Sequence, residues 1–168
     1  MGEVPAALSF GGNVGDVTAS FRHALARLGA SAGVAIEARS SVWRTKAWGK
    51  TDQPDFLNMA VLLRTSLGPQ ELLALCLTIE MERGRERRER WGPRTLDLDI
   101  LFYGDIVLRE KDLTLPHPRL AERAFVLAPL AEIAPQHRIG NRSVLEWLGA
   151  ADLSGVERDE AAAMELLL

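Results

Sequence analysis

The sequence has little cysteine and no long apolar run. Its 168 residues include one cysteine, Cys76, which excludes an internal disulfide and fits a reducing compartment. No apolar stretch approaches the roughly 18 residues that a membrane span needs, and no secretory segment follows Met1. We therefore expect a cytoplasmic protein that does not enter a membrane.

An excess of positive charge is absent as well. The chain carries 20 Lys and Arg against 23 Asp and Glu, a formal net charge of −3. This balance argues against general electrostatic binding to nucleic acid or to an anionic membrane, so any anion site must be local. The length and the hydrophobic content of 47% predict one domain over residues 1–168, and we expect a monomer.

Three common cofactor signatures are also absent. The stretch WGKT imitates the end of a P-loop, but Arg44 stands where the earlier glycine is required. In GGNVGD, Asn13 occupies the place of a glycine in the dinucleotide fingerprint. The three histidines lack the spacing of zinc ligands. Only His117 has an argument for function, because a proline on either side fixes its backbone near two arginines.

The apolar patterns predict an α+β fold. PAALSFGGN begins as a strand that breaks at Gly11-Gly12, and Asp16 can cap the helix that follows. Residues 34–44 alternate as one strand, FLNMAVLLRT is another, Gly68-Pro69 can start a second helix, and TLDLDILFY is the fourth strand. This order predicts a ferredoxin-like βαββαβ antiparallel sandwich with an added C-terminal strand and short helices. Residues 144–168 are expected to form a helical tail.

Two acidic residues interrupt an otherwise apolar strand. Alternate residues of a strand point to opposite faces, so Leu96, Leu98, Ile100 and Phe102 are expected on one face and Asp97 and Asp99 on the other. The same alternation in FLNMAVLL places Phe56 and Asn58 on the face of the aspartates. One face of the predicted sheet is core, and the other is a candidate site.

The aspartates have two interpretations. They can form ion pairs with Arg90 or Arg94, or they can share Mg²⁺, which binds to one or two carboxylates together with water and phosphate oxygens. Residues 83–94 contain six arginines and two glutamates, a local charge of +4. Arginine binds phosphate in a bidentate manner. The combination favours a site for a polyphosphate with Mg²⁺.

The motif RWGPRTLDLDILFYGD resembles the signature of the 6-hydroxymethyl-7,8-dihydropterin pyrophosphokinases, enzymes of folate synthesis. LSFGGNVGD, TDQPDFLN and LPHPRLAERAFVLAPLAEIAP resemble further segments of that family, so the resemblance spans about residues 6–135. Two positions depart from the family pattern. Gly12 replaces a common serine, and Lys46-Ala47 stands where prolines are frequent.

The resemblance implies transfer of the pyrophosphoryl group of ATP to the pterin, with two Mg²⁺ ions held by Asp97 and Asp99. Small molecules, and not nucleic acid or a membrane, are then the partners. The catalytic residues implied are Arg85, Arg87 (or its neighbour Arg88), Asp97 and Asp99. Those implied on the ATP side are Glu80, Arg94, Ile100, His117 and Arg123, and those implied for the pterin are Thr45, Trp48, Phe56, Asn58, Trp91 and Phe125.

Two other classes of protein use a similar sheet. A palm-type nucleotidyltransferase also places a carboxylate pair and two metal ions on a ferredoxin-like sheet, but the aromatic residues and Asn58 have no evident role there. An RNA-binding module of this fold exposes aromatic residues on its open face. Here LDLDILFY places acids on that face, and these repel phosphate in the absence of a metal.

Overall fold

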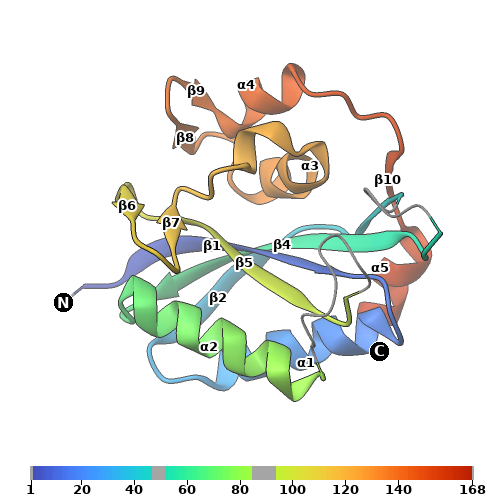
Figure 1. Ribbon diagram of the computed structural model, residues 1–168, viewed down its shortest axis with the longest axis horizontal. Coiled ribbons are helices and arrows are strands. Elements are labelled where there is room, and N and C mark those ends of the chain that lie inside the picture. Colours follow the sequence, from blue (N-terminus) through green and yellow to red (C-terminus); the bar gives the residue numbers. More distant parts are fainter. Residues whose placement is uncertain (1, 47–51, 85–93, 168) are drawn as a thin grey trace.

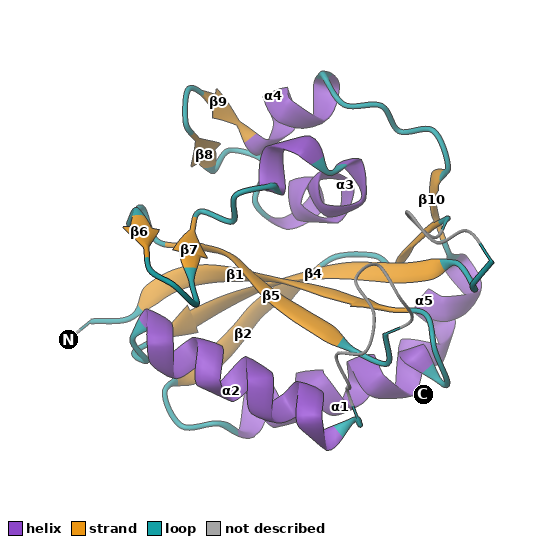
Figure 2. Ribbon diagram, in the orientation of Figure 1, coloured by secondary structure: helices purple, strands orange, loops and turns teal. Residues whose placement is uncertain are grey.

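A computed structural model describes residues 2–46, 52–84 and 94–167 (Figure 1). Within these residues six strands form one antiparallel sheet: β1 (Val4–Gly12), β2 (Val34–Arg39), β3 (Trp43–Thr45), β4 (Phe56–Thr65), β5 (Asp97–Tyr103) and β10 (Val156–Arg158). Helices α1 (Val17–Ala30) and α2 (Pro69–Glu82) cover one face of this sheet (Figure 2). The predicted mixture of helices with an antiparallel sheet is confirmed.

The other face of the sheet is covered by later parts of the chain. Helices α3 (Ala124–Ile133) and α4 (Val144–Gly149) lie over it, whereas α5 (Glu160–Leu166) packs beside α1 (Figure 1). The remaining elements are the hairpin strands β6 (Leu108–Arg109), β7 (Thr114–Leu115), β8 (Arg138–Ile139) and β9 (Arg142–Ser143), and the 3₁₀ helix η1 (Leu120–Glu122). Separate apolar clusters fill the two sides of the sheet.

Local sequence explains where the two long helices begin. The Asp16 carboxylate accepts a hydrogen bond from the Ala19 N–H at 3.0 Å, as an N-cap does. Helix α2 begins with Pro69 after Gly68, whose N–H donates to the Glu71 carboxylate at 2.9 Å. Each helix buries the apolar side that its sequence predicts, including Phe21 in α1 and Ile79 in α2.

Strand β1 lies in the middle of the sheet. It pairs with β4 on one side and with β5 on the other, and β2 and β3 both pair with β4. The predicted break at Gly11-Gly12 is wrong, because β1 continues through both glycines and Gly11 pairs with β4 and β5 at once. This pairing carries β1 into the floor of the site described below.

Residues 34–44 form two strands and not the single one predicted. Ser40 interrupts them: its N–H donates to the Ala60 carbonyl at 2.9 Å, and its hydroxyl oxygen accepts from the Ala60 N–H at 2.8 Å. The side chain thus takes the hydrogen bond that a strand carbonyl would accept. A register shift between Ile36 and Ala38 accompanies the break.

The alternation predicted for β5 holds only up to Ile100. Ala7 pairs with Phe102 and Leu8 with Ile100, so Leu101 is an extra residue at a bulge. The bulge reverses the later side chains: Phe102 packs in the cluster beneath α3, and Tyr103 packs on the side of α1 and α2. The prediction that Phe102 shares a face with Leu98 is therefore wrong.

The C-terminal part of the chain is more varied than a helical tail. Between α4 and α5, β10 pairs with β3 at one edge of the sheet. A hydrogen bond of 2.8 Å from the Asp159 N–H to the Val42 carbonyl continues this attachment. None of the helices among the described residues is both long enough and apolar enough to span a membrane.

Candidate active site

A cleft of about 920 Å³ opens on the sheet face that α3 and α4 partly cover. Strands β1, β4 and β5 form its floor, and the segment around α3 and the segment after α4 form its sides. Nine of the residues predicted from the sequence line it: Thr45, Phe56, Asn58, Arg94, Asp97, Asp99, His117, Arg123 and Phe125.

The floor of the cleft is set by strand register. Asn58 of β4 and Asp97 of β5 both pair with Gly11, which lies between them. Side chains of directly paired residues project from the same face of a sheet, so the amide and the carboxylate flank a position without a side chain. Ser9 lies in the same way between Ala60 and Asp99. The predicted common face of Asn58 and the two aspartates is confirmed.

The two aspartates differ in their surroundings. Asp97 is partly buried and lies 3.6 Å from the Arg94 guanidinium, measured from Oδ2 to Nε. Asp99 is exposed. The ion-pair interpretation is therefore realised for Asp97 with Arg94. A group of three or more His, Cys, Asp or Glu side chains that could hold a metal ion does not occur among the described residues.

Asn58 is held at the end of the cleft next to β3. It is buried, and its Nδ2 donates to the Thr45 hydroxyl at 3.1 Å. Thr45 pairs with Phe56 in the sheet, so these three predicted residues form one group. The guanidinium carbon of Arg123 lies 5.6 Å from the centroid of the Phe125 ring. An amide beside aromatic rings can bind the edge and faces of a flat heterocycle.

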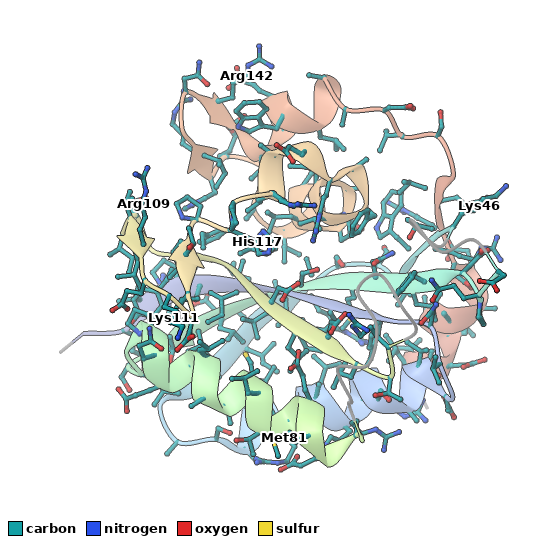
Figure 3. All side chains as sticks on the ribbon, in the orientation of Figure 1. Lys46, Met81, Arg109, Lys111, His117 and Arg142 are labelled. Atoms are coloured by element: carbon teal, nitrogen blue, oxygen red, sulfur yellow. The ribbon has the colours of Figure 1, made fainter. Side chains whose placement is uncertain are left out.

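A second recess, of about 260 Å³, adjoins the first. It is lined by Glu80, Leu98 and Ile100 and by residues of the β6–β7 region, including Lys111 and Thr114. Asp99 and His117 line both recesses. Figure 3 shows His117 between the sheet and α3, whereas Met81 points outward from α2. Two binding spaces thus meet at one carboxylate and one imidazole.

Glu80 is a buried carboxylate in an otherwise apolar side of helix α2. Only 2% of its surface is exposed, and its Oε2 accepts a hydrogen bond of 2.7 Å from the Leu98 N–H. A hydrogen bond between a carboxylate and a backbone N–H offsets part of the cost of burial. Glu80 thus joins α2 to β5 directly before Asp99, and it lines the second recess.

His117 is fixed by two backbone hydrogen bonds. Its N–H donates to the Leu101 carbonyl at 2.8 Å, and its Nδ1 accepts from the Arg119 N–H at 3.1 Å. Burial, with the charges of Arg123 and Arg119, lowers the pKa of His117 to about 4. With Nδ1 acting as an acceptor, the neutral ring carries its proton on Nε2, which makes that atom a hydrogen-bond donor.

Arg123 directly precedes helix α3 and lines the cleft. Burial lowers the pKa of its guanidinium, and the negative charge of Asp99 opposes that shift. An arginine remains charged under these conditions. The lining of the cleft therefore carries a fixed positive charge at Arg123.

Sequence reasoning missed the structural role of Asn13. This buried side chain donates from Nδ2 to the Gln53 side chain at 2.9 Å and to the Pro54 carbonyl at 2.8 Å, and its Oδ1 accepts from the Arg94 N–H at 2.9 Å. It connects the start of β5 with the approach to β4. The only signal in the sequence is an asparagine directly after two glycines.

Some predicted residues fall outside the described parts of the chain. These are Trp48, Arg85, Arg87, the alternative Arg88, and Trp91. The predicted ion-pair partner Arg90 lies outside them too.

A carboxylate pair on a cleft floor, with arginines beside it and an adjoining recess, defines a candidate phosphotransferase site. The family model of 7,8-dihydro-6-hydroxymethylpterin-pyrophosphokinase (HPPK) matches residues 7–135, and the chain belongs to this family.

Curated relatives agree with this assignment. A 2-amino-4-hydroxy-6-hydroxymethyldihydropteridine pyrophosphokinase of Methylorubrum extorquens is 48% identical over 153 residues, which cover 91% of this chain and 97% of that protein. A protein of the same name from Bacillus subtilis is 50% identical over 129 residues, 77% of each chain.

Solved structures show the same fold. The crystal structure of an HPPK-DHPS in complex with substrates superposes with a TM-score of 0.70 at 12% sequence identity. The match covers 89% of this chain and 43% of that one, so this chain spans less than half of the length of that protein.

Proposed function

We propose that the protein transfers the pyrophosphoryl group of ATP to 6-hydroxymethyl-7,8-dihydropterin in folate synthesis. The hydroxymethyl oxygen bonds to the β-phosphorus, the bond from this phosphorus to the oxygen shared with the α-phosphorus breaks, and AMP leaves. The hydroxyl proton passes to solvent. The observation that carries the proposal is that two recesses meet at Asp99 and His117. A transfer between two substrates requires that both are bound with their reacting ends together.

The larger cleft suits the pterin and the transferred phosphates. Asn58 offers a donor and an acceptor to the edge of the heterocycle, while Phe56 and Phe125 supply aromatic surface next to it. This placement points the hydroxymethyl group toward Asp97 and Asp99.

The smaller recess suits the nucleoside of ATP. Glu80 and Ile100, both assigned to the ATP side, line it, and the recess opens beside His117. A nucleoside there would extend its triphosphate past His117 into the larger cleft. His117 would donate from Nε2 to a phosphate oxygen, and Arg123 would bind the same group through its guanidinium.

The carboxylates of Asp97 and Asp99 fit a hard divalent cation. Their positions on one strand face leave them next to the space assigned to the phosphates, and phosphate and water oxygens would complete the coordination. We assign two Mg²⁺ ions to this pair, as the family resemblance implies. Bound Mg²⁺ neutralises charge on the phosphates during the transfer. Arg94 holds Asp97 in place from the side. Arg85, Arg87, Trp48 and Trp91 keep their roles as predictions.

We also propose that the sheet and its two long helices form a ferredoxin-like core. The chain order β1-α1-β2-β4-α2-β5 and the strand order β5-β1-β4-β2 support a ferredoxin-like core. A single domain, a monomer and a cytoplasmic location remain predictions from the sequence. The palm-type nucleotidyltransferase is not favoured, since the family match covers the cleft residues from Thr45 to Phe125.

Product analysis tests the proposal. Purified protein is incubated with ATP, Mg²⁺ and the hydroxymethyl-dihydropterin, and nucleotides are separated by chromatography. We expect AMP in an amount equal to the pterin consumed, and no AMP without the pterin. Formation of ADP, or release of free pyrophosphate, would rule the proposal out.

A further inference from the structure

The segment that follows α4 lines the larger cleft although it lies outside the range matched by the family model, residues 7–135. Six of its residues contribute: Ala150, Ala151, Asp152, Ser154, Gly155 and Val156. In Figure 1 this part of the chain runs from α4 down to β10 along one end of the sheet. We call residues 150–156 the C-terminal wall.

The C-terminal wall lies near residues assigned to the pterin. At one end Ala151 packs against the same apolar cluster as Phe125, and its N–H donates to the Leu148 carbonyl at 3.0 Å. At the other end Val156 pairs with Thr45, which pairs in turn with Phe56. The wall therefore runs from the apolar cluster that Phe125 packs against to a strand paired with Thr45.

The wall is held in place from both directions along the chain. Val156 N–H donates to the Leu153 carbonyl at 3.0 Å, and Gly155 has a φ of 75°, which closes the turn between them. Beyond β10, Glu165 of α5 accepts a 2.7 Å hydrogen bond from the Thr18 hydroxyl and a 2.8 Å hydrogen bond from Arg22 at its backbone carbonyl. The wall is thus a supported part of the fold.

The side chains that the wall presents are small or polar. Ala150, Ala151 and Gly155 occupy little volume, whereas Asp152 and Ser154 form one hydrogen-bonded pair at 2.6 Å. Small side chains on one side of a pocket determine how much of a ligand fits there. This side lies by Thr45 and Phe56, away from the second recess.

We propose that the C-terminal wall determines specificity for the pterin by limiting the bulk of the bicyclic heterocycle that enters between Phe125 and Thr45. This inference rests on the proposed function and extends it to residues beyond the family match. The wall does not line the second recess, so it affects the pterin and not the nucleoside.

Steady-state kinetics of three variants test the role of the wall. Ala150 is exposed, so Ala150→Leu and Ala150→Met place a larger side chain at the cleft lining, where it reduces the free space, and leave the core unchanged. Ala161, exposed on α5 and away from the cleft lining, provides the matched control Ala161→Leu. We expect the Ala150 variants to raise the KM for the pterin about tenfold, with kcat and the KM for ATP changed less than about twofold. Ala161→Leu should match the unchanged protein in all three constants.

The outcomes separate the two proposals. An unchanged pterin KM in both folded Ala150 variants would overturn the role of the wall, and so would an equal rise of both KM values, which indicates general distortion. If the unchanged protein forms no AMP from ATP and the pterin, the proposed function itself fails. In that case a fluorescence titration still tests the role of the wall. It compares the dissociation constant of the pterin for the unchanged protein with that for the Ala150 variants, and equal constants would overturn the role.

Discussion

Asn58 and Asp97 belong to different strands, yet both pair with Gly11 of the strand between them. The Asn58 amide, proposed to bind the pterin, and the Asp97 carboxylate, proposed to bind Mg²⁺, therefore lie on either side of one glycine. A Cβ atom added at Gly11 would lie 3.7 Å from Asn58 Oδ1, an ordinary contact distance. The backbone tolerates a methyl group there, but the cleft floor would lose space.

Gly11→Ala should impair binding and leave stability nearly unchanged. We expect a pterin KM raised about tenfold and an unfolding free energy within about 1 kcal/mol of the original. The matched variant Gly12→Ala should instead lower the unfolding free energy and leave the pterin KM nearly unchanged. Its Cβ would lie 2.8 Å from the Thr95 carbonyl oxygen, which is too close for the backbone to accept without a shift. Urea unfolding and pterin kinetics on both variants check this pair. Similar effects of the two substitutions would contradict the geometry.

Asp97→Asn and Asp99→Asn should abolish turnover while the fold survives. Each substitution keeps the shape of the side chain and removes a charge, so we expect a loss of several kcal/mol of transition-state stabilisation at saturating Mg²⁺. The control Asp105→Asn changes an exposed carboxylate that does not line the cleft. Normal turnover in either cleft variant would remove the assignment of the metal site.

Asn58→Ala should weaken pterin binding by about 1–3 kcal/mol, because one edge of the heterocycle loses its hydrogen-bonding partner. Binding of ATP should change little, since Asn58 lines only the larger cleft. Isothermal titration with each substrate measures both quantities. If ATP binding falls and pterin binding persists, Asn58 belongs to the nucleotide side.

Asn13→Ala should lower the unfolding free energy by about 2–3 kcal/mol, because three hydrogen bonds of a buried side chain are lost. Asn141→Ala, at an exposed position, is the control and should have little effect. Equal stability of the two variants, measured by urea unfolding, would show that the Asn13 contacts contribute nothing.

His117 should make stability depend on pH between about 4 and 6.5. Its folded pKa of about 4 lies below its ordinary value of 6.5, so in this interval the unfolded chain binds the proton more readily. The contribution is complete above pH 6.5 and is lost as the pH falls to about 4, by about 1–3 kcal/mol. Burial lowers the pKa of His137 also, so the test compares the original protein with His117→Gln. Identical pH profiles of the two would contradict the burial of His117.

Periodicity predicted the parts of the fold that depend on local sequence. The caps at Asp16 and Gly68 and the common face of Asn58, Asp97 and Asp99 follow from patterns within single segments. The break at Ser40 and the bulge at Leu101 depend on hydrogen bonds between distant strands, which a local pattern does not record. An edge strand of three residues, such as β10, is too short to show an alternation of apolar and polar residues. The side of the cleft that it supports was therefore beyond sequence reasoning.

The most direct measurement follows two labels of ATP through one reaction with the hydroxymethyl-dihydropterin. With α-³²P-ATP we expect all radioactivity from the consumed ATP in AMP, and with γ-³²P-ATP we expect it in the pterin product. This result requires attack at the β-phosphorus, as expected if both substrates meet at Asp99 and His117. Label from α-³²P-ATP in the pterin product, or label from γ-³²P-ATP in free phosphate or pyrophosphate, would contradict the account.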